Sequence, residues 1–233
     1  RIDMRTRQTR VWGKLGWINP NRTAESIGIQ VLANDVLQDF NLSNRGDYDA
    51  RQQTLYANLI YQNYISNTNH QIRTGISALL DQVSETFGTQ TFNRTEPVTG
   101  IFGEYTYRYL EKVRLVGAIR ADYQALWERV SLSPRFHFLY RPNDWSSLRI
   151  SAGRGMRTAN ILSENFGMFA SNREIVIQRS EGNLPAYGLP QEIGWNIGIN
   201  ASRDFRIGSR PLQVRAEIGR AHVELQSHSD LVC

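Results

Sequence analysis

The sequence has almost no cysteine and no long apolar run. Its only cysteine, Cys233, is the last of 233 residues, so no disulfide can form within the chain. A helix that crosses a membrane needs about 20 consecutive apolar residues. The best apolar run here, residues 115–119, is flanked by Arg114 and Arg120. These absences exclude a domain stapled by disulfides and a bundle of membrane helices.

Signals for binding nucleic acid or metal are also lacking. Lys and Arg outnumber Asp and Glu by 27 to 22, but they are scattered and form no basic block of the kind that follows phosphates. The four histidines and the single cysteine have no spacing typical of metal ligands. We therefore expect no nucleic-acid partner, no metal and no cofactor.

The two ends of the sequence carry separate expectations. Residues 1–10 are polar and basic and lack the apolar core of a signal peptide, so we expect the chain to be a fragment with any export signal upstream. Residues 217–233 resemble translated sequencing-adapter DNA, read in two frames joined near Val223 and Glu224. We therefore assign residues 1–216 to one domain and expect residues 217–233 to be a non-native tail.

What the sequence does contain is a period-two alternation of apolar and polar side chains. Glycine and asparagine fill one face of residues 193–201, and the other face carries Ile193, Trp195, Ile197, Ile199 and Ala201. The same alternation recurs in residues 55–65, 71–80, 104–109, 115–123 and 132–141. This pattern predicts β-strands that have one apolar and one polar face.

The predicted strands are long, and their connections alternate in length. Ten strands are expected, near residues 5–18, 23–38, 51–66, 70–86, 97–110, 112–126, 130–141, 145–154, 191–205 and from 211 onward. Ordinary globular strands have about 5–6 residues, whereas a tilted membrane strand needs about 9–11. Short joins alternate with long joins expected over 39–50, 87–96 and 155–190. Short periplasmic turns and long outer loops are typical of bacterial outer-membrane β-barrels.

Aromatic residues gather near both ends of the predicted strands. Near the short joins lie Trp17, Tyr64, Tyr107, Tyr109, Tyr140, Trp145 and Phe205, and near the long joins lie Phe40, Phe87, Tyr123 and Trp127. Two aromatic girdles are expected at the two interfaces of a membrane barrel. Aromatic residues also favour strands in general, and a soluble sandwich can alternate in the same way. A soluble all-β domain therefore stays open.

The region from Ser151 to Gly198 narrows the choice among barrels. It contains SAGRGMRTANILSENFGMFAS and then LPQEIGWNIGIN. It resembles the part of TonB-dependent outer-membrane receptors where a strand ends in a Gly-x-Gly-aromatic-Arg-Ala-Pro-like stretch, an acidic residue follows, and a Pro-Glu motif opens the next strand. The Arg-Thr-Ala-Asn form of the stretch is similar to the Bacteroidetes branch. Met156 departs from the usual aromatic, and Gln191 is inserted within Pro-Glu.

This resemblance implies a fold, a location and a set of partners. The fold is all-β, a partial antiparallel transmembrane β-barrel with about ten meander strands out of a probable total of about 22. The location is the outer membrane of a bacterial cell, in contact with its lipid. The implied partners are the missing plug domain and the rest of the barrel, the TonB complex through the missing N-terminal part, and a scarce nutrient. That nutrient is of the siderophore, cobalamin, haem or glycan class.

Two sets of candidate site residues follow. The resemblance suggests contacts with a plug or ligand at Gly153, Gly155, Arg157, Asn160, Glu164 and Glu192. The alternation places toward the lumen Arg73, Arg108, Arg120, Asp122, Arg135, His137 and Arg149. We expect the two glycines to allow close approach of the backbone. Arg157 is expected to pair with a plug carboxylate or within the wall.

Three other functions were compared with import by a receptor. A passive porin and a soluble extracellular binding domain both remain open. An outer-membrane hydrolase would need a nucleophile beside a histidine. His137 shares its predicted face with Ser131 and Ser133, but a single inward histidine is more often a hydrogen-bonded wall residue, and we expect no enzyme.

Overall fold

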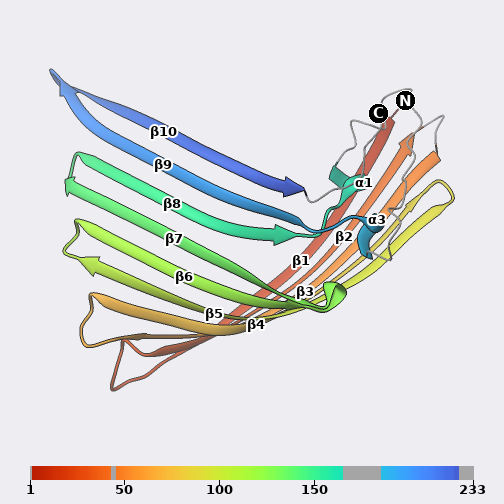
Figure 1. Ribbon diagram of the computed structural model, residues 1–233, viewed down its shortest axis with the longest axis horizontal. Coiled ribbons are helices and arrows are strands. Elements are labelled where there is room, and N and C mark those ends of the chain that lie inside the picture. Colours follow the sequence, from red (N-terminus) through yellow and green to blue (C-terminus); the bar gives the residue numbers. More distant parts are fainter. Residues whose placement is uncertain (1, 43–45, 165–184, 226–233) are drawn as a thin grey trace.

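The computed structural model describes residues 2–42, 46–164 and 185–225, and these form one ten-stranded sheet (Figure 1). The strands are β1 (Ile2–Ile18), β2 (Ser26–Leu42), β3 (Gly46–Tyr64), β4 (His70–Phe87), β5 (Gln90–Tyr109), β6 (Val113–Gln124), β7 (Arg129–Asn143), β8 (Ser146–Arg157), β9 (Glu192–Ile207) and β10 (Arg210–Leu225). Each strand pairs antiparallel with the next one along the chain. The predicted all-β meander of ten strands is confirmed.

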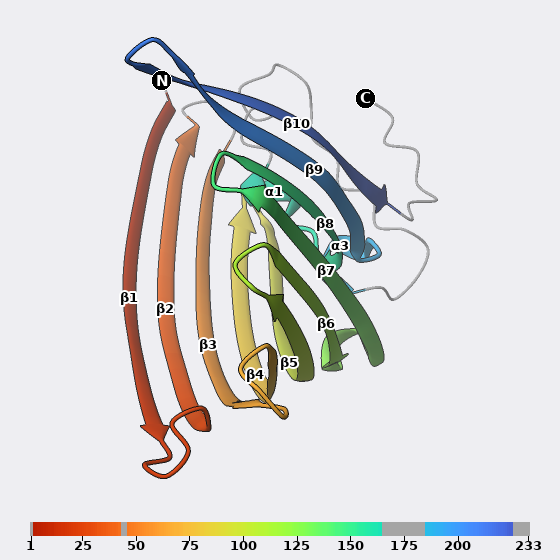
Figure 2. The ribbon, with the colours of Figure 1, turned by 90° about the vertical axis from the view of Figure 1, so that its left-hand side faces the viewer.

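The sheet is curved and open. Its strands bend around a common hollow, and β1 and β10 lie at its two edges (Figures 1 and 2). The helical elements are short: α1 (Ile161–Glu164) and α3 (Pro185–Gly188) have four residues each, and η1 (Ala125–Trp127) has three. No helix in the described ranges is long and apolar enough to cross a membrane. An open, curved meander is the shape expected of a partial barrel.

Apolar and polar side chains are distributed between the two faces of the sheet in the opposite way to that of a soluble protein. Large apolar side chains lie exposed on the convex face, as in the case of Ile101, which is 63% exposed. Polar side chains are buried on the concave face, where Ser131 is only 3% exposed. A sheet of a soluble domain buries its apolar face against a core. The observed distribution suits a sheet that has lipid outside and a polar lumen inside.

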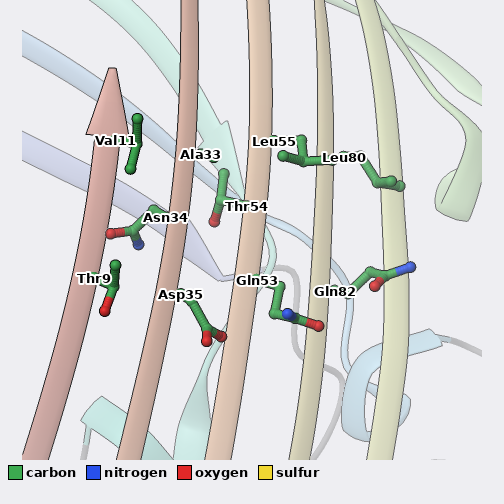
Figure 3. A pocket seen from close by; sticks show the side chains of 10 residues that line it. All are labelled: Thr9, Val11, Ala33, Asn34, Asp35, Gln53, Thr54, Leu55, Leu80 and Gln82. Atoms are coloured by element: carbon green, nitrogen blue, oxygen red, sulfur yellow. The ribbon is translucent and has the colours of Figure 1, made fainter.

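The apolar band on the convex face has a sharp boundary across β1–β4. One row of paired residues is apolar and consists of Val11, Ala33, Leu55 and Leu80. The next row on the same face is polar and consists of Thr9, Asp35, Gln53 and Gln82 (Figure 3). Both rows line one shallow depression of the sheet. The line between them is the edge of the apolar band on this part of the sheet.

Two of the three predicted long joins are wrong. Residues 39–50 lie mostly in β2 and β3, which reach Leu42 and begin at Gly46, and residues 87–96 lie mostly in β5, after a turn at Gly88 with φ of +58°. The physical reason is the boundary just described. Beyond the apolar band both faces of a strand meet water or polar groups, so the alternation fades while the backbone ladder continues.

The predicted aromatic girdle near the long joins is mostly wrong as well. Phe40 and Phe87 pack in an interior cluster, and the indole N–H of Trp127 donates to Thr158 on the concave side. Only Tyr123 of that group lies exposed on the convex face. At the opposite end of the strands, the exposed aromatic residues are Trp17, Tyr109, Tyr140, Trp145 and Phe205. That girdle agrees with the expectation for a membrane interface.

The two faces of β9 give a direct test of this arrangement. Ile197 lies in the middle of the apolar run on the convex face, and its neighbour Asn196 lies exposed on the concave face. We expect Ile197→Arg to lower the free energy of unfolding from lipid bilayers by about 2–4 kcal/mol, since a cation would enter hydrocarbon. Asn196→Arg is the control and should change it by less than about 1 kcal/mol. Denaturant titration of the full barrel in vesicles measures both, and equal losses would contradict the assignment of the faces.

Candidate functional site

The concave face carries the candidate site, because the segment between β8 and β9 folds back onto it. The described ends of this segment, residues 158–164 and 185–191, contain α1 and α3, which lie inside the curve of the sheet (Figures 1 and 2). Leu162 of α1 and Tyr187 of α3 are buried against Phe40 of β2 and Tyr48 of β3. The segment therefore spans from β8 and β9 to strands several positions away in the sheet.

A buried ion cluster lies beneath this segment. The guanidinium of Arg94 in β5 donates to Glu96 through Nε at 2.7 Å and lies 3.3 Å from Glu85 of β4 through Nη1. The side chains of Arg94 and Glu85 are 5% and 2% exposed. We call Glu85, Arg94 and Glu96 the buried ion cluster. With two carboxylates and one guanidinium, it has a formal charge of −1 and needs further donors.

Neutral donors supply the remaining hydrogen bonds, and most belong to the folded-back segment. Tyr48 donates its hydroxyl to Glu85 at 2.6 Å, and Tyr187 donates to the other oxygen of the same carboxylate. Thr158 donates to Glu96 at 2.6 Å, and Arg94 donates to the side-chain oxygen of Asn160. Burial, with the hydrogen bond to Glu85, raises the pKa of the Tyr187 phenol above its usual value. Tyr187 therefore stays a neutral donor.

This cluster fixes the segment in place. A buried charge without partners costs several kcal/mol, so the cluster is stable only while both sides supply their groups. Glu85, Arg94 and Glu96 come from the wall, and Thr158, Asn160 and Tyr187 come from the segment. Residues 158–164 and 185–191 of the segment are consequently held against the concave face, where they act as a brace.

The candidate motif residues separate into two groups. Arg157 bonds Glu164 through Nη1 and Nη2 at 2.7 and 2.8 Å, and Glu192 through Nε at 2.6 Å. This pairing lies within the chain, between β8, α1 and β9, and it gives the wall pairing that was one of the two expectations for Arg157. Asn160 instead belongs with the buried ion cluster.

The two candidate glycines do not need to be glycine for reasons of space. A Cβ at Gly153 would meet its nearest atoms at 3.6 and 3.7 Å, an ordinary contact, and a Cβ at Gly155 would meet nothing within 4 Å. No described part of this chain approaches either glycine closely, so the expected close approach remains a prediction for the plug or a ligand. By contrast, a Cβ at Gly75 or Gly100 would overlap atoms at 2.3 or 2.0 Å.

All seven residues predicted to face the lumen lie on the concave face. Each is an even number of positions from a residue of the same strand whose side chain forms a hydrogen bond on that face. Four are paired: Arg73 with Gln62 and Glu104, Arg108 with Gln71, and Arg120 with Asp122, itself one of the seven, and with Ser77. The others are Arg135, His137 and Arg149. Those three are exposed, and within the described ranges none of them forms an ion pair.

Comparison with protein families decides which group of barrels this is. Residues 5–207 match the family described as TonB dependent receptor-like, beta-barrel. The chain belongs to this family. The match covers most of the sequence and confirms the resemblance seen in residues 151–198. No curated protein matches the receptor barrel by sequence.

Solved structures give the same fold. The receptor barrel resembles the copper transporter OprC with a TM-score of 0.63 and 15% identity over 93% of this chain. It resembles the alcaligin outer-membrane receptor FauA of Bordetella pertussis with a TM-score of 0.62 and 12% identity over 95%. The FpvAI component of a complex with pyocin S2 has a TM-score of 0.60 and 10% identity. The chain spans 38%, 37% and 32% of these three, respectively.

Sequence reasoning missed the buried ion cluster of the receptor barrel. Arg94 and Glu96 fell in a predicted loop, and Glu85 lay at a predicted strand end. One signal was available. If the predicted strands are lengthened in the same register, Glu85, Arg94 and Glu96 all fall at the alternate positions whose side chains point to the concave face. Tyr48 shares that face on the neighbouring strand β3, whereas Tyr187 carried no comparable signal, because its contact with Glu85 depends on how residues 185–191 fold back. Within the described ranges, no three His, Cys, Asp or Glu side chains are grouped to hold a metal ion.

The buried ion cluster predicts a large effect of removing its cation. Arg94→Met would leave Glu85 and Glu96 buried without their guanidinium, and we expect the free energy of unfolding to fall by about 3–5 kcal/mol. Arg73→Met is the matched control, because the Arg73 side chain is 45% exposed and such pairs contribute about 0–1 kcal/mol. Denaturant titration of the folded barrel compares them. Equal small losses would show that the cluster does not hold the segment.

Proposed function

We propose that the chain is part of the barrel of a bacterial outer-membrane receptor that imports a scarce nutrient with energy from a TonB complex. The observation that carries the proposal is the sheet with exposed apolar and buried polar faces, in a chain of the TonB-dependent receptor family. Import by this mechanism also needs a plug and a TonB box, which we expect in the remainder of the protein. The proposal includes no catalysis.

The braced segment supports active import over a passive porin. It occupies the concave side near one end of β3–β5 and is fixed there by charged groups. A lumen narrowed in this way suits a solute that is bound and then released, rather than one that diffuses through open water. A passive porin remains the alternative.

Two arginines and a histidine that form no ion pair within the described ranges support a negatively charged cargo. Arg135 and His137 lie two residues apart on β7, and Arg149 lies on the neighbouring strand, two residues from the partner of His137. We call these three the cationic patch. Guanidinium groups bind carboxylate and phosphate oxygens in a bidentate way. Among ferric siderophores, cobalamin, haem and glycans, we therefore favour a cargo that carries acidic groups. One solved relative is named as a copper transporter and another as an alcaligin receptor, so the named cargoes differ within this fold.

Contacts with the plug are proposed for the motif residues that remain accessible. Arg157 already has carboxylate partners in Glu164 and Glu192, but its side chain is 57% exposed on the concave face. The group has two carboxylates and one guanidinium, so a cation of the plug would find an acceptor there. Assignment to the Bacteroidetes branch rests on the Arg-Thr-Ala-Asn sequence of residues 157–160.

We also propose that residues 217–233 are foreign to the barrel. In the register of β10, Arg220 pairs with Ile197 and so shares the convex face in the middle of the apolar band. An arginine facing lipid near the midplane costs about 2–4 kcal/mol, and a native strand of this kind would avoid it. Reading the genomic DNA past codon 216 tests the point, and a natural frame that encodes residues 217–233 would refute it.

The cationic patch gives the functional prediction. In cells that carry the complete gene, we expect Arg135→Gln together with Arg149→Gln to raise the cargo concentration for half-maximal uptake about tenfold, because two charged hydrogen-bond donors are lost. Arg73→Gln is the control, since Arg73 is already paired. Deletion of tonB should abolish uptake in all strains. Uptake that continues without TonB would favour the passive porin.

A further inference from the structure

The wall of the barrel is incomplete between β7 and β8. These strands pair from Arg135 with Gly153 to Asn143 with Ser146, and no pairing continues beyond Gly153. Yet β7 stays paired with β6 as far as Arg129, and β8 stays paired with β9 as far as Arg157. The two strands separate toward the end that carries α1 and α3 (Figure 1). The ladder between β7 and β8 therefore ends part-way along two strands that both continue, and we call the unpaired stretch, residues 129–134 of β7 and 154–157 of β8, the opening in the ladder.

Pro134 explains where the opening begins. The carbonyl of Leu132 accepts a hydrogen bond from Arg154 and so points toward β8. Residues two apart on a strand direct their backbone groups to the same neighbour, so Pro134 also faces β8. Proline has no N–H and cannot donate to a ladder. Counted from the turn between β7 and β8, the last residue of β7 that pairs with β8 is Arg135, the neighbour of Pro134.

Arg154 lies at the mouth of the opening. It shares the convex face of β8 with Ala152 and Ile150, and its Nη1 donates to the Leu132 carbonyl at 2.8 Å. Among the described residues this is the hydrogen bond that Arg154 makes, and it uses one of the five N–H groups of a guanidinium. Exposed apolar side chains on the convex face of the neighbouring strands are Val130 and Leu132 of β7 and Trp195 of β9, and Trp195 is the residue paired with Arg154. Within the described ranges, no carboxylate lies in salt-bridge range of Arg154.

We propose that this opening binds the phosphate of an anionic glycolipid of the outer leaflet. The inference rests on the proposed function for the presence of the membrane. A guanidinium at a lipid-facing surface is costly without an anion, and phosphate matches its paired N–H groups. Backbone groups of β7 and β8 that lack a ladder partner face the same opening. Val130, Leu132 and Trp195 provide an apolar surface for the acyl chains, which a free phosphate ion would not use.

The test uses the complete receptor purified from outer membranes, with bound glycolipid counted by native mass spectrometry. Arg154→Gln should reduce the retained glycolipid on the order of tenfold, because charge-assisted hydrogen bonds are lost. Arg154→Lys keeps the charge and should retain an intermediate amount, since lysine lacks the planar fork. Arg73→Gln, on the concave face of β4, is the control and should leave the glycolipid unchanged.

Three outcomes would overturn the proposal: no glycolipid on the wild-type receptor, equal retention by Arg154→Gln, or release of the glycolipid by millimolar inorganic phosphate. Folding of each variant is checked by the resistance of the barrel to unfolding in cold detergent. Uptake of cargo is measured in parallel. Loss of TonB-dependent uptake in the wild type would refute the proposed function while the count of bound glycolipid still decides the lipid site.

Discussion

In lipid, every backbone N–H and C=O group must find a partner within the protein, and the long antiparallel ladder of this chain meets that demand. Nine successive strand pairs carry the ladder, and most run in unbroken register over the full length of both strands. The ladder leaves the side chains free to divide into an outer apolar face and an inner polar face. Between β7 and β8 the ladder ends at Arg135 and Gly153, so it gives no partner to the facing backbone groups beyond that point. Arg154 lies there and donates to one of them, the Leu132 carbonyl.

The concave face depends on the same separation of environments. Charged groups can be buried there because they face one another rather than lipid, as Arg94 does between Glu85 and Glu96. Their burial makes the position of the folded-back segment sensitive to each partner, since an unpaired charge would cost more than the pair contributes. The paired cations therefore hold the lumen in shape. Arg135, His137 and Arg149 lie exposed, and we propose that they bind the ligand.

The alternation of apolar and polar residues predicted the strands and their order, but it did not predict the contacts across the lumen. Strands such as residues 193–201 were predictable because every second side chain must be apolar in lipid. The long joins over 39–50 and 87–96 were predicted wrongly because that rule ends at the edge of the apolar band, while the strands continue to Leu42 and begin again at Gln90.

The candidate site shows the same limit. The alternation of side chains along each strand was enough to predict that Arg73, Arg120 and Arg149 lie on the concave face. The partners of Arg157 could be narrowed only to plug or wall, and the contact of Tyr187 with Glu85 joins residues 102 positions apart. Such a contact depends on how one segment crosses the hollow of the sheet. No periodicity within a strand encodes that path.

The central claim is that the convex face meets lipid and the concave face meets water. Spin labels on single cysteines along β9, from residue 193 to 201, test it most directly, after Cys233→Ser removes the one cysteine of this sequence. In lipid bilayers, labels at 193, 195, 197, 199 and 201 should be accessible to dissolved oxygen, and labels at 194, 196, 198 and 200 to a water-soluble nickel complex. Accessibility to the nickel complex at all nine positions, without alternation, would contradict the account.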